Sequence, residues 1–234
     1  MSSNTTRHET RGLIFDMDGV LTDSEWFIAE AARLMFRETH RVEVRHGDFA
    51  EFIGMGENRY LGGVAAKYGV RDFEIERDKA RTYAIYGELV KGKPPAKGPL
   101  KAMPGAVEFV RASASLGLKI AVATSTDYVK MRANLEAVGL GDGIFHATVN
   151  GLEVERRKPF PDLFLEAARR IGVPPESCWV VEDSVSGVAA AKAAGMRCLG
   201  LLTTTAKEAI RGKGADLVAK DLSAIRPEAL TGAL

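Results

Sequence analysis

Cysteine is scarce in this chain, and long hydrophobic runs are missing. Only Cys178 and Cys198 occur in 234 residues, and they are not spaced as a C-x-x-C pair. This usage favours reduced, buried thiols over a disulfide framework or a zinc site. No window reaches the roughly 20 apolar residues of a membrane span, and the polar N-terminus lacks the apolar centre of a signal peptide. We therefore expect a cytoplasmic protein with no membrane contact.

An excess of charge of one sign is also missing. Lysine and arginine number 32 against 31 aspartate and glutamate, which gives a net charge of +1. A nucleic-acid-binding domain usually carries a basic footprint. We therefore expect no nucleic-acid partner, and any basic residue that matters must act locally.

The rest of the composition is that of a globular protein. Hydrophobic residues make up 46% of the 234 residues, so the chain can bury a full core. This length suits one large domain or a domain that carries an insertion.

The stretch 13–24 reads LIFDMDGVLTDS, a short apolar run followed by two carboxylates and a glycine. Residues 11–15 have the apolar, β-rich character of a buried strand, whose period of two puts Asp16 and Asp18 on the same side. Two carboxylates about 4 Å apart repel each other by roughly 4 kcal/mol at an effective dielectric constant of about 20. Such a site needs a cation or keeps one acid protonated, and an enzyme can use either state.

Residues 24–98 show helical periodicity and no clear strand. Apolar residues recur at helical spacing in 27–35, in 61–68 and from about 72 to 90. A run of glycine, proline and lysine then breaks the pattern. We predict that 1–23 and 99–234 form a core and that 24–98 form an inserted helical cap.

Beyond Pro104 helices and strands alternate. Helices end in a glycine followed by an apolar residue, as at Gly139 and Gly172, which is the left-handed helix stop. This alternation predicts an α/β fold, a doubly wound parallel sheet with helices on both faces. Ligands bind such sheets beyond the carboxyl ends of the strands. The strands are predicted at 119–124, 147–149, 178–182 and 196–201.

Polar side chains gather at the ends of these strands. The first strand ends in Asp16 and Asp18, and Lys158 stands before a proline that opens a helix. Two further strand ends supply hydroxyls and acids, namely Thr124, Ser125 and Thr126, and Glu182, Asp183 and Ser184. Because the carboxyl ends of parallel strands meet at one edge, we expect a single site that combines carboxylates, hydroxyls and a lysine.

These motifs resemble those of the haloacid dehalogenase-like phosphohydrolases, especially the β-phosphoglucomutase-like branch. The resemblance runs from about residue 11 to residue 203 and keeps the family's order of motifs. It implies a Rossmann-like core with a small helical cap inserted after the first strand, in agreement with the periodicity. The four motifs are the Asp16-x-Asp18 stretch, the hydroxyl of Thr124, Lys158-Pro159 and Glu182-Asp183-Ser184.

The resemblance implies a role for each catalytic residue. Asp16 resembles the nucleophile that takes the phosphoryl group, and Asp18 resembles the acid that protonates the leaving oxygen and then activates water. Thr124 and the backbone amide of Ser125 hold the phosphoryl oxygens, and Lys158 offsets charge during transfer.

The resemblance also implies a Mg²⁺ cofactor. Its expected ligands are Asp16, the backbone carbonyl of Asp18 and Asp183, and Glu182 either binds the ion or lies next to a residue that does. Asp23 lies where the cap hinges. The residues expected to contact the substrate or its phosphate are Gly19, Asp23, Thr124, Ser125 and Lys158.

The predicted reaction is the Mg²⁺-dependent hydrolysis of a small phosphorylated metabolite, a sugar or polyol phosphate, through an aspartyl-phosphate. A sugar-phosphate mutase on the same scaffold is the near alternative, and a non-catalytic binding member of the fold is another. The expected partner is the small-molecule substrate alone, and we expect a monomer.

Three positions favour the phosphatase over the mutase. In an ungapped alignment with the family mutases, Glu57 replaces a cap arginine that binds the distal phosphate, and Ile28 replaces a histidine beside the general acid. Asp127 stands where a phosphate-binding lysine is expected. A shift of one helical turn would instead turn Arg59 or Lys67 toward the substrate.

Overall fold

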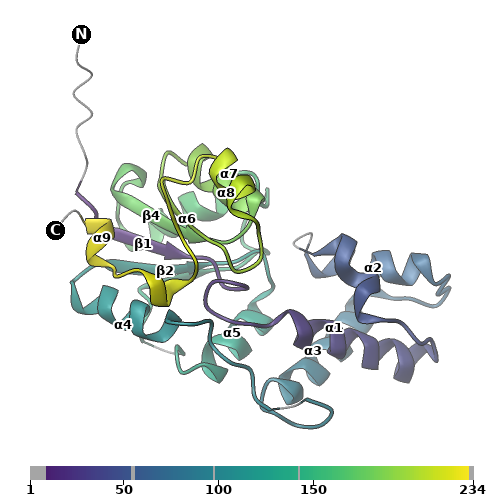
Figure 1. Cartoon of the computed structure of the whole chain (residues 1–234). Coiled ribbons are helices and arrows are strands. Elements are labelled where there is room, and N and C mark those ends of the chain that lie inside the picture. Colours follow the sequence, from purple (N-terminus) through teal and green to yellow (C-terminus); the bar gives the residue numbers. More distant parts are fainter. Residues whose placement is uncertain (1–8, 54–55, 97, 142, 232–234) are drawn as a thin grey trace.

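The computed structural model of this chain describes residues 9–53, 56–96, 98–141 and 143–231, and a six-stranded sheet lies at its centre (Figure 1). The strands are ordered β3-β2-β1-β4-β5-β6, and every neighbouring pair is parallel. The carboxyl ends of all strands therefore lie along one edge. Their bounds are β1 Gly12–Phe15, β2 Lys119–Ala123, β3 Ala147–Val149, β4 Cys178–Glu182, β5 Arg197–Leu201 and β6 Leu217–Ala219.

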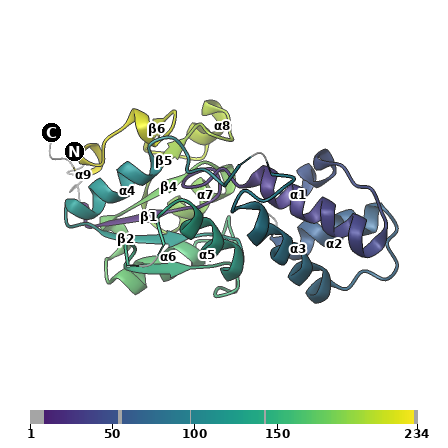
Figure 2. The ribbon, with the colours of Figure 1, turned by 90° about the horizontal axis from the view of Figure 1, so that it is seen from below.

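Helices cover both faces of this sheet (Figures 1 and 2). Helices α4, α5 and α9 pack on one face, and α6, α7 and α8 pack on the other. The predicted doubly wound α/β fold is confirmed. The bounds of these helices are α4 Ala106–Ser115, α5 Tyr128–Ala137, α6 Asp162–Ile171, α7 Val185–Ala193, α8 Lys207–Gly212 and α9 Glu228–Thr231.

Alternate residues of each strand build the two halves of the core. In β1, Leu13 and Phe15 belong to the cluster under α4 and α5, whereas Ile14 belongs to the cluster under α6 and α7. All three side chains are fully buried. A strand buried on both faces is apolar throughout, which is why the first strand is a continuous apolar run in the sequence.

The described residues between 24 and 98, here called the helical module, form a group of helices beside the sheet (Figures 1 and 2). Phe36, Leu61 and Tyr86 lie in a hydrophobic cluster of its own, and α3 contacts α5 of the sheet region. The module contains α1 Glu25–Met35, a π-helical turn Phe36–His40, a 3₁₀ helix His46–Phe52, α2 Glu57–Lys67 and α3 Ile75–Leu89.

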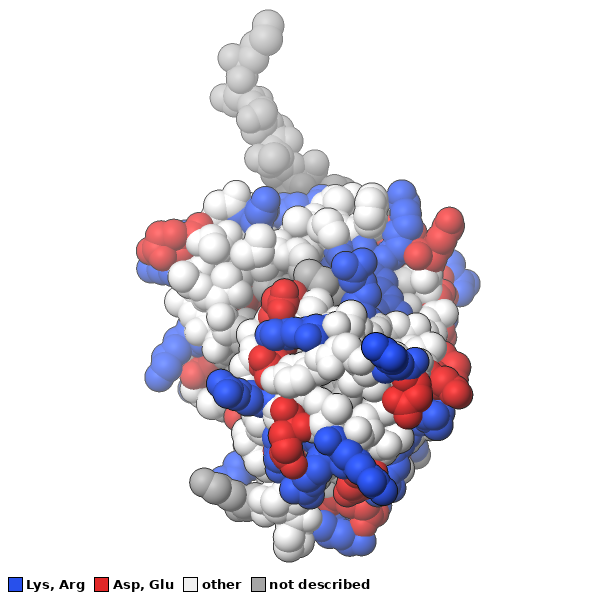
Figure 3. Space-filling model, turned by 90° about the vertical axis from the view of Figure 1, so that its right-hand side faces the viewer, with Lys and Arg blue, Asp and Glu red and all other residues white. Residues whose placement is uncertain are grey.

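The surface of this end of the molecule is mixed in charge. Figure 3 shows lysine and arginine interspersed with aspartate and glutamate on the face it presents. Pairs such as Arg81 with Glu38 at 2.5 Å and Lys67 with Asp48 at 2.9 Å account for this pattern. Among the described residues, no helix combines the length and the hydropathy that crossing a bilayer requires.

The structure differs from the sequence prediction chiefly near the C-terminus. The strands at 147–149 and 178–182 have the predicted bounds, and the third helix of the module begins at Ile75 and not near 72. Helix α8, strand β6 and helix α9 were not predicted. They have 6, 3 and 4 residues, too few for a hydrophobic period to be recognised.

Candidate active site

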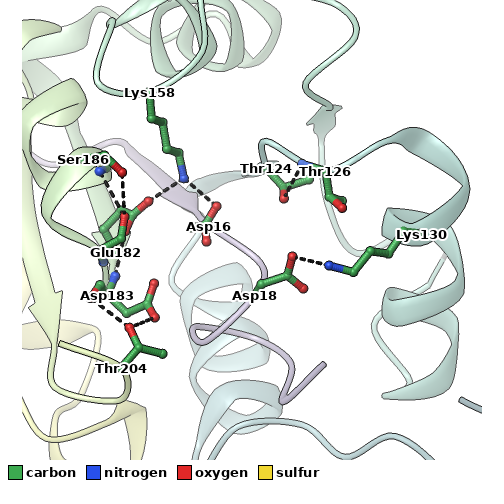
Figure 4. Close-up of polar contacts among 12 residues, drawn as sticks. Asp16, Asp18, Thr124, Thr126, Lys130, Lys158, Glu182, Asp183, Ser186 and Thr204 are labelled. Carbon is green, nitrogen blue, oxygen red and sulfur yellow. Dashed lines mark hydrogen bonds and ion pairs between the residues drawn. The ribbon is translucent and has the colours of Figure 1, made fainter. Parts of the chain in front are cut away.

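The carboxyl ends of β1, β2 and β4 bring the predicted motifs together (Figure 4). Phe15 of β1 pairs with Val122 of β2 on one side and with Val181 of β4 on the other. The next residues along these strands therefore lie side by side. The backbone N–H of Asp16 continues the ladder by donating to Val181 O at 3.0 Å, which fixes where the Asp16 side chain begins.

Three buried carboxylates form the centre of the site. One oxygen from each of Asp16, Glu182 and Asp183 lies within 4.8 Å of the others. Burial raises the pKa of Asp16 to about 7 despite the nearby Lys158, and the charge of Glu182 adds to the rise. Burial, with the charges of Glu182 and Asp16, also raises the pKa of Asp183 well above its usual value. The cluster therefore favours a bound cation.

Lys158 supplies one positive charge to this cluster. Its Nζ donates to Asp16 Oδ1 at 2.6 Å and to Glu182 Oε1, and it lies 5.0 Å from the centre of the Phe164 ring. Burial alone would lower the pKa of Lys158, but Asp16 and Glu182 outweigh burial and hold it above its usual value. One ammonium thus lies among three carboxylates, and the excess of negative charge remains.

Glu182 is occupied by internal hydrogen bonds. Its Oε2 accepts from the backbone N–H groups of Asp183 at 2.8 Å and Ser184 at 2.7 Å, and from Ser184 Oγ at 2.9 Å. Its Oε1 accepts from Lys158. Ser184 also caps α7, because its Oγ accepts from the N–H of Gly187 at 3.0 Å. Glu182 therefore orients Lys158 and the start of α7.

The other two carboxylates keep an oxygen directed to the site. Their internal hydrogen bonds engage Oδ1 of Asp16, from Lys158, and Oδ2 of Asp183, from Thr204 Oγ1 at 2.5 Å. Carboxylate oxygens are the ligands that Mg²⁺ takes, usually together with water. This donor set, with its excess negative charge, fits Mg²⁺.

Two glycines allow this close packing, and the sequence analysis recognised neither role. Gly19 has φ +79°, and a Cβ there would lie 2.1 Å from Asp183 Oδ2. A Cβ on Gly187 would lie 1.8 Å from Glu182 Oε1. That Gly19 contacts the substrate stays a prediction, and its N–H donates to Thr22 O at 2.9 Å. In the structure Gly19 makes room for a carboxylate.

We expect Asp183→Ala to weaken Mg²⁺ binding more than Glu182→Ala, because Glu182 already has donors on both oxygens. Glu182→Ala should instead lower the unfolding temperature more, since it leaves two backbone N–H groups of the α7 turn without their acceptor and removes one of the two carboxylates that Lys158 contacts. Calorimetric Mg²⁺ titration and thermal unfolding of both variants check this. Equal metal affinities in the two variants would refute the ranking.

Mg²⁺ should stabilise the protein more at about pH 7.5 than at about pH 5. The pKa of Asp16 rises from 3.8 to about 7 on folding, so the folded chain binds the extra proton in this range. Without metal, the free energy of unfolding therefore falls as pH rises through this range. Thermal unfolding with chelator and with Mg²⁺ at both pH values measures the difference. The same metal-induced shift at both pH values would contradict this prediction.

Asp18 lies beside this cluster and has different partners. Its Oδ2 accepts from Lys130 Nζ at 2.7 Å (Figure 4). Its Oδ1 accepts from Asn134 Nδ2 at 3.2 Å and from Ser24 Oγ. Lys130 and Asn134 lie on α5 and are buried. The sequence analysis missed both. Their i, i+4 spacing in the helix after Thr124 is the signal that marks one polar face.

The hydroxyl loop follows β2. Thr124 is 2% exposed, its N–H donates to Val149 O at 3.0 Å, and its Oγ1 accepts from the N–H of Thr126 at 3.3 Å. Ser125, between them, is half-buried. Asp23 is exposed at the junction with the helical module, where its N–H donates to Lys101 O.

The positions that separate phosphatase from mutase also lie near the site. Glu57 of α2 is 7% exposed and its Oε1 accepts from Thr126 Oγ1, so the module meets the hydroxyl loop there. Asp127 pairs with Lys79 of α3 at 3.3 Å, whereas Arg59 is exposed. Lys67 is also directed away, since it pairs with Asp48 at the surface.

The model of the haloacid dehalogenase-like hydrolase family matches residues 10–195. This chain belongs to that family. The resemblance stated from the sequence is confirmed, as is the prediction of an enzyme of this hydrolase type. The match extends from the start of β1 through the helical module and the Glu182-Asp183 turn to the end of α7.

Named relatives of this haloacid dehalogenase-like hydrolase differ in length and activity. The protein SUPPRESSOR OF QUENCHING 1, chloroplastic, of Arabidopsis thaliana is 42% identical over 91% of this chain, which spans 20% of that protein's length. The phosphorylated carbohydrates phosphatase of Thermotoga maritima is 33% identical over 79% of this chain and 81% of its own. The solved structure of a putative beta-phosphoglucomutase from Thermotoga maritima has 29% identity and a TM-score of 0.71, and the match covers 96% of this chain and 98% of that one.

Proposed function

We propose that this haloacid dehalogenase-like hydrolase is a Mg²⁺-dependent phosphatase that acts on a small phosphorylated metabolite, a sugar or polyol phosphate, through an aspartyl-phosphate on Asp16. The arrangement of Asp16 supports this most directly. Its carboxylate lies at the carboxyl edge of the sheet, held by Lys158 at 2.6 Å and close to a second acid, Asp18. A nucleophile beside a separate acid is what phosphoryl transfer through a covalent intermediate requires.

The first half-reaction makes the phosphoenzyme. A carboxylate oxygen of Asp16 forms a bond to phosphorus while the bond from phosphorus to the leaving oxygen breaks, and the carboxylic acid of Asp18 gives that oxygen its proton. Thr124 Oγ1 and the N–H of Ser125 hold the phosphoryl oxygens. Lys158 offsets the charge that spreads over them.

The second half-reaction restores the enzyme. Asp18, now a carboxylate, takes a proton from water as the water oxygen forms a bond to the phosphorus of the aspartyl-phosphate and the bond from phosphorus to the Asp16 oxygen breaks. Inorganic phosphate leaves, Asp16 is again a carboxylate and Asp18 is again an acid. The two acids therefore have distinct roles, in keeping with the distinct partners of Asp16 and Asp18.

Asp16, Asp183 and the backbone carbonyl of Asp18 are the residues we propose to hold Mg²⁺, with Glu182 adjacent to them. When bound, Mg²⁺ neutralises negative charge on the phosphoryl oxygens and brings them toward the nucleophile. The raised pKa of Asp16, about 7 in the absence of metal, supports this placement because a cation favours the ionised, attacking form.

Glu57 supports hydrolysis over the mutase reaction. A mutase has to bind a bisphosphate at both ends and keep water from the phosphoenzyme between half-reactions. The carboxyl group of Glu57 is buried beside the hydroxyl loop, and its Oε2 has no hydrogen-bond partner among the described residues. Burial raises the pKa of Glu57. In either protonation state its carboxyl group gives a second phosphate no cationic partner, whereas it forms hydrogen bonds with the hydroxyls of a sugar or polyol.

The helical module, residues 24–98, is in this proposal the cap over the substrate, and residues 1–23 and 99–234 form the catalytic core. The contact of Glu57 with Thr126 and that of Lys79 with Asp127 join the two parts beside the hydroxyl loop. Asp23 lies at the hinge. A monomer in the cytoplasm stays a prediction.

The test is the release of inorganic phosphate from a panel of phosphorylated metabolites, with Mg²⁺ and with chelator. We expect hydrolysis of sugar or polyol monophosphates that needs Mg²⁺. A parallel assay supplies β-glucose 1-phosphate with catalytic glucose 1,6-bisphosphate and follows glucose 6-phosphate and free phosphate. Isomerisation that outruns phosphate release would make this protein a mutase, and no turnover in either assay would favour the non-catalytic alternative.

A further inference from the structure

Lys130 is a buried cation that no motif of the sequence assigns. It lies in the first turn of α5, and its side chain is 7% exposed. Its Nζ donates to Asp18 Oδ2 at 2.7 Å (Figure 4). Removing an ammonium from water is costly unless it is paired, so this lysine depends on the carboxylate that it contacts.

Hydrogen bonds, and not close packing, fix the orientation of the Asp18 carboxyl group. The Asp18 side chain is 34% exposed, compared with 10% for Asp16. Donors reach both of its oxygens, with Lys130 on Oδ2 and Asn134 and Ser24 on Oδ1. Lys130 is the charged donor, and charge-assisted hydrogen bonds are roughly twice as strong as neutral ones.

The donors of Asp18 are themselves held by the helical module. Asn134 Oδ1 accepts from the hydroxyl of Tyr86 on α3, and Ser24 stands directly before α1. The backbone N–H groups of Phe27 and Ile28 donate to Ser24 O at 3.0 and 3.2 Å, which fixes the serine at the start of that helix. The orientation of Asp18 is therefore built from α5 on one side and from the module on the other.

We propose that Lys130 is a positioning residue that holds the carboxyl group of Asp18 toward the leaving oxygen of the substrate. This proposal rests on the proposed phosphatase function. In the first half-reaction the leaving oxygen takes the Asp18 proton as its bond to phosphorus breaks. A correctly placed acid matters most when the leaving group is an alkoxide, because an alkoxide is a poor leaving group without a proton.

A direct role for Lys130 in phosphate binding is the competing explanation. The two explanations differ in which substrates lose activity when the lysine is removed. A lysine that binds the transferring phosphate contributes to every phosphate ester alike. In the first half-reaction, which kcat/KM reports, a lysine that positions the acid contributes to alkyl esters and little to p-nitrophenyl phosphate, whose leaving group is a stable anion without a proton. The dependence on the leaving group therefore separates positioning from binding.

The experiment compares kcat and KM of wild type, Lys130→Met and Lys130→Arg on two substrates with Mg²⁺. One is the best alkyl phosphate from the metabolite panel, and the other is p-nitrophenyl phosphate. We expect Lys130→Met to lower kcat/KM for the alkyl ester by about 100-fold and kcat/KM for the nitrophenyl ester by less than about fivefold. Lys130→Arg keeps a buried cation and should recover most of the loss.

Two reference variants complete the design. Asp18→Asn removes the acid itself and should show the same dependence of kcat/KM on the leaving group, while its kcat falls on both substrates because hydrolysis of the phosphoenzyme also needs Asp18. Lys192→Met breaks an ion pair with Asp216 of similar length, 2.6 Å, away from the site, and should leave both activities unchanged. Thermal unfolding shows whether each variant folds. If Lys130→Met does not fold, the two activities of Lys130→Arg decide between positioning and phosphate binding.

The possible results distinguish a failure of the Lys130 positioning role from a failure of the phosphatase function. Equal losses of kcat/KM on both substrates, or full activity of a folded Lys130→Met, would each overturn the positioning role. A wild type that hydrolyses neither substrate would instead refute the phosphatase function.

Discussion

Asp16→Asn should reduce phosphatase turnover to below about one thousandth of the wild-type value, given that enzymes accelerate such reactions by about 10⁶-fold or more. The asparagine amide occupies the same volume but cannot form an acyl phosphate. Its carbonyl oxygen can still accept from Lys158, and the backbone N–H of residue 16 still donates to Val181 O. The fold should therefore survive while the chemistry stops.

Phosphate release under substrate saturation measures this loss, and thermal unfolding checks the fold. Asp72→Asn is a suitable control, because it makes the same chemical change at a carboxylate whose side chain is 72% exposed in the helical module. It should keep full turnover. Residual activity of Asp16→Asn above about one thousandth would remove Asp16 from the role of nucleophile.

The sheet and the principal site residues were predictable because local patterns determine them. Ile14 and its neighbours form a continuous apolar run, as a strand buried on both faces requires, and a glycine with positive φ marks the end of helices such as α5, at Gly139, and α6, at Gly172. Once strands are parallel and adjacent, residues that follow them converge. Asp16, Thr124 and Asp183 therefore lie together although they are far apart in the sequence.

Lys130 and Glu182 show what a linear pattern leaves open. Lys130 lies in a helix without a marked apolar face, where a charged residue normally faces solvent, and the packing of α3 and α5 around Asp18 buries it. Glu182 was expected as a metal ligand or as the neighbour of one. Which of these roles it has depends on where its hydrogen bonds go, and these arise from the turn into α7, which the composition of the motif does not specify.

Asp18→Asn should slow turnover by roughly 10² to 10⁴, the usual contribution of a positioned acid or base. Both half-reactions lose the proton transfer that Asp18 provides. The effect on hydrolysis of the phosphoenzyme can be measured separately with an activated acyl phosphate such as acetyl phosphate. Its leaving group, acetate, needs no proton. With that donor Asp16 is still phosphorylated, while water is no longer activated, so the aspartyl-phosphate should accumulate.

The structure adds a second consequence of this substitution. An asparagine retains a single oxygen for Ser24, Asn134 and Lys130, so the buried ammonium loses its counter-charge. We expect a lower unfolding temperature for Asp18→Asn than for Asp16→Asn, in which Lys158 keeps Glu182 as a partner. Intact mass and peptide mapping after treatment with acetyl phosphate locate the phosphoryl group. A label on a residue other than Asp16 would reverse the roles of the two acids, and turnover near the wild-type rate would show that Asp18 transfers no proton.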